Sequence, residues 1–81
     1  MTVTVLFFAQ ARERAGCARA TLELAESATV GDLEGTIRRD YPRVAELCPT
    51  LAIAVDGELA RAATRIRPGA EVALLPPVSG G

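Results

Sequence analysis

The chain has 81 residues, 49% of them hydrophobic, so we expect one domain with a single two-layer core. Nine basic and ten acidic residues give a net charge of −1, which argues against a nucleic-acid partner. Apolar runs are far shorter than the ~20 residues of a membrane span, and the first residues lack the pattern of a cleavable signal. We therefore expect a soluble cytoplasmic protein with no membrane partner.

The side chains that most often catalyse reactions or bind metals are scarce. Histidine is absent, and Cys17 and Cys48 are too far apart in the sequence to suggest a metal-binding pair. We expect both cysteines to be reduced and to act as small hydrophobic residues, with no bound metal or cofactor. All nine basic residues are arginine, which is typical of a GC-rich bacterial genome. The alternative explanation for the absence of lysine is functional: a lysine-free surface cannot attack an activated acyl group on the same chain.

The first part of the chain shows a strand, a short helix and a second strand. Residues 2–8, TVTVLFF, are β-branched and aromatic and begin in strict alternation, which predicts a strand. Residues 9–15 predict a short helix that Gly16 closes at its C-terminal end. Residues 18–24 alternate again, which predicts a strand with one face in water.

The longest predicted helix begins after Thr29. Thr29 and Asp32 have the spacing of a capping box, with Asp in place of the usual Glu or Gln. Hydrophobic residues then recur at helical spacing and form one apolar stripe: Val30, Leu33, Ile37 and Tyr41. Pro42 disfavours helical geometry at the residue before it, so we expect the helix to end there. Irregular chain is expected from Pro42 to Pro49.

The second half of the chain predicts three more strands joined by turns. Residues 51–55, LAIAV, form a strand with the large side chains on one face. Asp56-Gly57 is the strongest hairpin signal in the chain, and a short returning strand should follow at residues 58–60. Pro68-Gly69 suits a type II turn, and residues 71–75 form the last strand.

This order of elements predicts an α+β roll in which a sheet of about five strands wraps one main helix. One long helix cannot cover both faces of a sheet, so the second face should stay open. If the first and last strands are neighbours, Phe8 and Leu75 lie together on that open face. An exposed apolar patch of this kind marks a partner surface. The alternative is that the short helix at residues 9–15 covers the patch.

The sequence ends in PPVSGG, which predicts a flexible tail over residues 76–81 beyond a folded domain of residues 1–75. Pro76 and Pro77 lack N–H donors, so they stop the last strand and project the chain outward. The tail reaches at most roughly 20 Å, and Gly80 and Gly81 suit a passage too narrow for a side chain. A carboxylate must be activated before it reacts, and the sequence shows no phosphate loop, catalytic triad or metal cluster that could do so. Another protein should therefore activate Gly81.

Two segments, VTVLFFAQARERAG near the start and GAEVALLPPVSGG at the end, resemble the MoaD family of molybdopterin synthase small subunits. The resemblance covers essentially the whole chain. It implies a ubiquitin-like β-grasp fold and the function of a sulfur carrier. It also implies a heterotetramer in which two such chains bind two large subunits.

The family resemblance further implies a role for each part of the tail. An ATP-dependent adenylating enzyme would activate Gly81, and a sulfurtransferase route would convert it to a thiocarboxylate. The large subunit would then use the sulfur to build the dithiolene of molybdopterin from cyclic pyranopterin monophosphate. The residues expected to enter the partner sites are Pro76, Pro77, Val78, Ser79 and Gly80. The positions that match the family's hydrophobic contact surface are Phe8, Leu59 and Leu75.

Three other functions stay open at this point. A carrier of the thiamine type shares the fold and the Gly-Gly end, although such chains are usually shorter and lack FFAQARE. A ubiquitin-like modifier would be joined to lysines of other proteins, and a plain interaction domain would need no chemistry at Gly81. Two turns also depart from the family, which often has Asn near Asp56-Gly57 and Asp-Gly-Asp near Pro68-Gly69-Ala70. Both departures concern local turn geometry.

Overall fold

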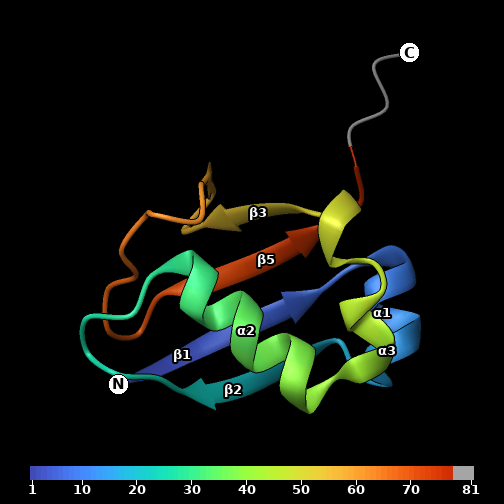
Figure 1. The fold of residues 1–81 in the computed structure, drawn as a ribbon, viewed down its shortest axis with the longest axis horizontal. Coiled ribbons are helices and arrows are strands. Elements are labelled where there is room, and N and C mark those ends of the chain that lie inside the picture. Colours follow the sequence, from blue (N-terminus) through green and yellow to red (C-terminus); the bar gives the residue numbers. More distant parts are fainter. Residues whose placement is uncertain (78–81) are drawn as a thin grey trace.

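The computed structural model describes residues 1–77, which form a sheet with helices on one side and at one end (Figure 1). The strands are β1 (Thr2–Phe7), β2 (Arg19–Glu23), β3 (Ala52–Val55), β4 (Glu58–Leu59) and β5 (Glu71–Leu75). The helices are α1 (Ala9–Ala15), α2 (Val30–Asp40), α3 (Pro42–Ala45) and the 3₁₀ turn η1 (Cys48–Thr50).

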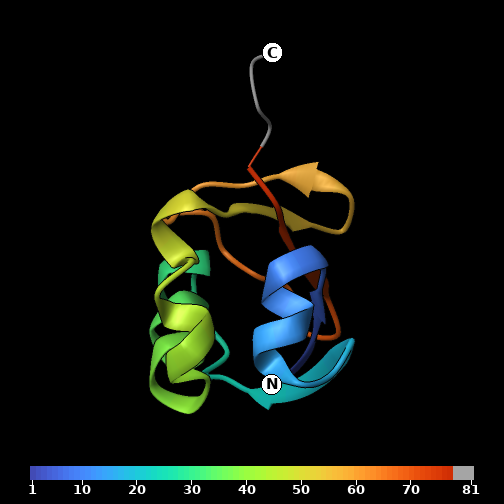
Figure 2. The same ribbon diagram turned by 90° about the vertical axis from the view of Figure 1, so that its right-hand side faces the viewer.

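The sheet is mixed, with strand order β2-β1-β5-β3-β4. The central strands β1 and β5 are parallel, and the other neighbours are antiparallel. Figures 1 and 2 show α2 lying across one face of this sheet. The predicted α+β roll, with the first and last strands as neighbours, is therefore confirmed.

The core lies between the sheet and α2. Along β1 the side chains of Val3, Val5 and Phe7 are buried, as the alternation predicted. They belong to one hydrophobic cluster with Leu33 and Ile37 of α2, both of which are fully buried. A fully buried side chain of this size stabilises the fold by about 1.5–3 kcal/mol. Within residues 1–77 no charged or polar residue is buried.

The start of α2 shows the predicted capping box. The Thr29 hydroxyl accepts a hydrogen bond from the Asp32 N–H at 3.3 Å, and the Asp32 carboxylate accepts one from the Thr29 N–H at 2.9 Å. Two N–H groups at the helix start are thus satisfied by side chains. The next two amides, of Val30 and Gly31, donate to the carbonyls of Thr64 and Ala62. These bonds tie α2 to the loop before β5.

The prediction of irregular chain from Pro42 to Pro49 is wrong. Pro42 ends α2, as expected, but it also begins α3, where its missing N–H has no helical partner to lose. Pro49 lies in η1 in the same way. Phe8 was also placed in the first strand, whereas β1 ends at Phe7 and Phe8 is the N-cap of α1. In both places a helix start was interpreted as an ending or a continuation of another element.

Both predicted turns are present. Asp56 and Gly57 have φ values of 49° and 87°, which is the left-handed pair that a tight hairpin requires. Gly69 has φ 78°, and the Arg67 carbonyl accepts the Ala70 N–H at 3.1 Å, as in a type II turn. The returning strand β4 is one residue shorter than predicted, because Ala60 lies outside it.

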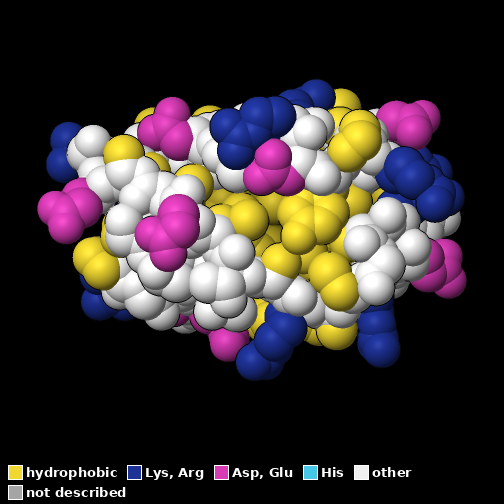
Figure 3. All heavy atoms as spheres, turned by 90° about the horizontal axis from the view of Figure 1, so that it is seen from below, with side chains coloured by type: hydrophobic (Ala, Val, Ile, Leu, Met, Phe, Trp, Pro, Cys, Tyr) yellow, Lys and Arg dark blue, Asp and Glu magenta, His cyan; other side chains and the backbone are white. Residues whose placement is uncertain are grey.

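The core is incompletely covered along the edge where α2 faces β2. Seen from below, hydrophobic side chains are visible there between rims of charged and polar groups (Figure 3). Ala20 and Leu24, in or next to β2, and Tyr41, at the end of α2, are half-buried residues that pack against the core. The Tyr41 ring contacts Phe7, with ring centroids 5.1 Å apart. This edge is separated from β5 by β1.

Candidate functional site

The root of the tail lies at one end of the sheet. Because β1 and β5 are parallel and Phe7 pairs with Leu74, both strands end at the same edge. Pro76 and Pro77 follow β5 and are exposed, and the chain leaves the sheet beside α1 and η1 (Figure 2). The other predicted tail residues, Val78, Ser79, Gly80 and Gly81, lie outside the described residues.

The face of the sheet that α2 leaves uncovered carries an apolar stripe. Paired residues of neighbouring strands share a face, and the pairs Leu6–Ala73, Ala73–Ala54, Ala54–Leu59 and Ala52–Leu75 follow one another across four strands. The members of this open-face stripe are Leu6, Ala52, Ala54, Leu59, Ala73 and Leu75. The same register places polar residues on the rest of that face: Thr4, Arg19, Thr21 and Glu71. Leu75, the last residue of β5, belongs to the stripe and directly precedes Pro76, so the stripe ends at the tail.

The three predicted contact residues occupy different positions around this stripe. Leu59 lies on the edge strand β4 and is 73% exposed, and Leu75, the last residue of β5, is half-buried. Phe8 is 43% exposed, so α1 does not cover it. Within residues 1–77, Phe8 and Leu59 are the only large hydrophobic side chains that are exposed. Their role in binding stays a prediction.

A cavity beside the tail was not predicted from the sequence. It has a volume of about 310 Å³ and three walls: residues 8–11 at the start of α1, residues 47, 50 and 51 around η1, and Pro76-Pro77. Segments from three distant parts of the sequence meet here, and one of them lies around the turn η1, where the sequence analysis predicted irregular chain. No local pattern in the sequence could have found this tail-root cavity.

The backbone at Ala9 is strained where it borders the tail-root cavity. Ala9 has φ 50°, in the left-handed region, which costs a residue with a Cβ about 1 kcal/mol or more. Ala9 is the first residue of α1 and comes directly after Phe8, whose backbone is extended. The strain is confined to the junction that places Phe8 next to the tail.

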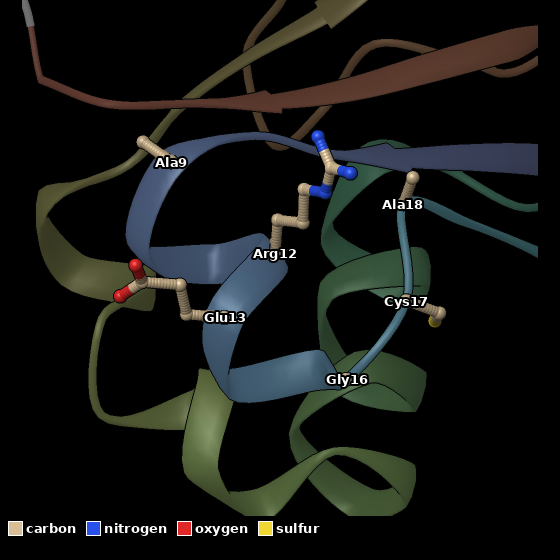
Figure 4. Close-up of a pocket in the computed structure, with 6 residues that line it drawn as sticks. All are labelled: Ala9, Arg12, Glu13, Gly16, Cys17 and Ala18. Atoms are coloured by element: carbon tan, nitrogen blue, oxygen red, sulfur yellow. The ribbon is translucent and has the colours of Figure 1, made fainter.

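A second, wider hollow lies on the other side of α1. It has a volume of about 560 Å³ and is bordered by α1 and the turn that follows it. Figure 4 shows Arg12 pointing toward Ala18, while Glu13 points away from it and the Cys17 sulfur points outward. These side chains do not converge on a common point, so the hollow has no arranged acid, base or nucleophile.

The two cysteines lie in different environments. Cys17 is half-buried and free, and Cys48 is buried in η1, where burial raises the pKa of its thiol. A buried thiol with a raised pKa is a poor nucleophile. Within residues 1–77, no three His, Cys, Asp or Glu side chains are grouped so that they could hold a metal ion.

Comparison with known proteins assigns the family. A model of the ThiS family matches residues 5–81. The chain belongs to the ThiS family. It is 36% identical to the molybdopterin synthase sulfur carrier subunit of Chlamydomonas reinhardtii, and the match covers all of both chains. The resemblance to molybdopterin synthase small subunits is thereby confirmed.

Solved structures confirm the fold. SAMP1 from Haloferax volcanii superposes with a TM-score of 0.89 at 27% identity, and both chains are covered completely. A chain from the complex of subunits 1 and 2 of the molybdopterin-converting factor of Helicobacter pylori 26695 gives a TM-score of 0.71 at 27% identity, again over both whole chains. Ubiquitin from Caldiarchaeum subterraneum gives 0.64 at 18% identity, covering 100% of this chain and 98% of that one. The predicted ubiquitin-like β-grasp fold is correct.

None of the helices within residues 1–77 is both long and apolar enough to cross a bilayer.

Proposed function

We propose that this chain is a sulfur carrier that supplies the sulfur used by molybdopterin synthase. The observation that carries the proposal is its similarity, over the whole of both chains, to a molybdopterin synthase sulfur carrier subunit. The fold supports it, because the chain leaves the sheet at the edge where the open-face stripe ends. A partner that binds the stripe is thus held next to the tail.

The proposed chemistry takes place at the carboxyl group of Gly81. An adenylating enzyme joins this carboxylate to the α-phosphate of ATP, and pyrophosphate leaves. A sulfurtransferase then provides persulfide sulfur, which displaces AMP, and a thiol reduces the resulting acyl disulfide to a thiocarboxylate. In the large subunit the thiocarboxylate sulfur bonds to cyclic pyranopterin monophosphate, and water cleaves the acyl–sulfur bond to restore the carboxylate.

In this proposal the chain itself is a non-catalytic subunit, and the catalytic residues belong to its partners. Phe8, Leu59 and Leu75 contact the large subunit, and residues 76–81 enter its active site. We expect two carriers and two large subunits to form a heterotetramer in the cytoplasm, where ATP is available. The Helicobacter pylori complex of subunits 1 and 2 supports binding between the two kinds of subunit for a similar chain.

The decisive test is to extend the chain by one alanine after Gly81. The extended variant should neither gain sulfur, measured by intact mass spectrometry after incubation with the adenylating enzyme, ATP and a sulfur source, nor support molybdopterin synthesis. Its thermal unfolding should match that of the unmodified chain. The matched control inserts one alanine after Met1 and should gain one sulfur in place of one oxygen. An extended variant that still becomes a thiocarboxylate would contradict the proposal.

A second candidate function is that of a protein modifier. It is favoured by the similarity to SAMP1 of Haloferax volcanii, which is a small archaeal modifier protein. In that case an amine of a target protein attacks the acyl-adenylate, an amide forms, AMP leaves, and the amine proton passes to water. Mass spectrometry of native cells separates the two functions. A modifier is found as an adduct on other proteins, whereas a carrier is recovered as a thiocarboxylate with its large subunit.

A further inference from the structure

The tail-root cavity lies where any protein that accepts the tail must approach. Six residues, 76–81, reach at most about 20 Å, so the active site that receives Gly81 lies within that distance of the root. Pro76-Pro77 form one wall of the cavity. They also follow directly on Leu75, the end of the open-face stripe. The cavity and the stripe therefore both border the root of the tail.

The open-face stripe is too poor in large side chains to hold a stable partner by itself. A stable interface buries about 800 Å² on each partner and depends on a few large side chains seated in pockets. Three of the six stripe residues are alanine, namely Ala52, Ala54 and Ala73, and Ala54 is already buried. The interface must then extend further, and the tail-root cavity is the adjacent concave surface.

The lining of the tail-root cavity selects an apolar occupant. None of its residues is charged, and its polar side chains are Gln10 and Thr50. The Thr50 hydroxyl already donates a hydrogen bond to the Leu47 carbonyl at 2.8 Å. Phe8, Leu47 and Leu51 supply apolar surface. At about 310 Å³ the cavity is at the lower end of the range of ligand pockets, about 300–1,000 Å³, and suits a single large side chain.

We propose that the tail-root cavity receives one aliphatic or aromatic side chain of the synthase large subunit. This inference rests on the proposed function, because that function makes the large subunit the stable partner. The inserted side chain packs against Pro76-Pro77 and holds the root of the tail in one direction. The tail then enters the active site from a fixed start, which lowers the entropy cost of placing Gly81.

The proposal is tested by filling the cavity. Gln10→Trp puts a bulky ring at its rim, and Arg12→Trp puts the same ring on the same helix in the wider hollow. Calorimetry with purified large subunit should give a dissociation constant for Gln10→Trp at least tenfold larger than that of the unmodified chain. Tenfold corresponds to about 1.4 kcal/mol. The dissociation constant of Arg12→Trp should stay within about twofold of that of the unmodified chain, because Arg12 lines the wider hollow and not the tail-root cavity. Both residues are exposed on α1, so thermal unfolding should change little.

Thr50→Trp fills the same cavity from the opposite wall and decides the matter if Gln10→Trp does not fold. Folded variants at either position that bind the large subunit as tightly as the unmodified chain overturn the proposal. Failure of the proposed function has a different signature. In that case the unmodified chain itself does not bind the large subunit, or Gly81 gains no sulfur.

Discussion

At the scale of single residues, Asp56 connects the hairpin turn to the start of β5. Its carboxylate accepts the Glu71 N–H and a guanidinium N–H of Arg67, each at 3.0 Å. Its own N–H donates to the Glu71 carbonyl at 2.8 Å. These contacts lower the pKa of Asp56, first through the backbone hydrogen bond from Glu71 and then through Arg67. Asp56, near which the family often has Asn, therefore finds its hydrogen-bond partners close by, at Arg67 and Glu71.

The substitution Asp56→Asn tests this connection through its pH dependence. A carboxyl group with a lowered pKa in the folded state stabilises the protein above its unfolded pKa of about 3.9. That contribution is lost as the pH falls through the lower folded-state pKa. Asp56→Asn should therefore lower the urea midpoint at pH 7, and the difference should shrink toward pH 3.

The control for this measurement is Glu58→Gln, which neutralises an exposed carboxylate in β4 next to the same turn. It should shift the urea midpoint less than Asp56→Asn at pH 7. A loss for Asp56→Asn that is the same at pH 7 and pH 3 would show that the charge of Asp56 does not stabilise the turn.

At the scale of elements, α2 contains two glycines in different surroundings. A Cβ on Gly31 would lie 3.3 Å from the Ala62 carbonyl oxygen, the same atom that accepts the Gly31 N–H at 2.9 Å. A Cβ on Gly35 would have no atom within 4 Å. Close packing on the loop before β5 thus explains Gly31, while nothing in the structure explains Gly35.

The matched pair Gly35→Ala and Gly31→Ala separates helix propensity from packing. Gly35→Ala should raise the free energy of unfolding by about 0.5–1 kcal/mol, because alanine loses less backbone entropy in a helix. Gly31→Ala should gain less or lose stability, because the loop carbonyl must move. Urea unfolding measures both. Equal gains would show that the loop yields without cost.

The elements also show why the segment after α2 was predicted wrongly. Pro42 and Pro49 were interpreted as signs of irregular chain, because proline interrupts the interior of a helix. In the structure both stand in the first turn of a short helix, where proline is tolerated. Helices of three or four residues leave too few positions for a periodic pattern. Packing of buried Val44 and Cys48 on the core decides them instead.

At the scale of the whole molecule, the residues that stabilise the fold and those proposed to bind the large subunit lie in different places. The core lies between α2 and one face of the sheet, whereas the open-face stripe lies on the other face. The tail-root cavity lies at the border of the core, which Ala11 reaches from α1. Leu33 is fully buried in the core, and Leu59 is mostly exposed at the end of the stripe. Changes at these two positions should therefore affect different measurements.

Leu33→Ala and Leu59→Asp test this separation. Leu33→Ala should lower the free energy of unfolding by about 2–5 kcal/mol, because it leaves a cavity. Leu59→Asp should change it by no more than about 0.5 kcal/mol. The same Leu59→Asp should weaken binding of the large subunit at least tenfold, about 1.4 kcal/mol, since it places a charge in a desolvated contact.

The control for the added charge is Thr21→Asp, on the polar part of the same face. It should bind the large subunit nearly as well as the unmodified chain, as measured by calorimetry. If Thr21→Asp and Leu59→Asp weaken binding equally, the effect comes from net charge and the stripe is not the contact surface.

The sequence by itself determined the features that depend on neighbours along the chain. The alternation in β1, the capping box at Thr29 and the turn at Asp56-Gly57 could be predicted because each is decided within a few residues. The family could be recognised from the two end segments. The division into residues 1–75 and a tail of residues 76–81 stays a prediction.

Only the tertiary structure decided which surfaces lie together. Strand register joins residues 6, 52, 54, 59, 73 and 75 into one stripe, and no sequence pattern states that register. The tail-root cavity needs the start of α1, the turn η1 and Pro76-Pro77 at one place. Such contacts depend on how the chain folds back over long sequence separations, so their free energy belongs to the packed fold and to no single segment.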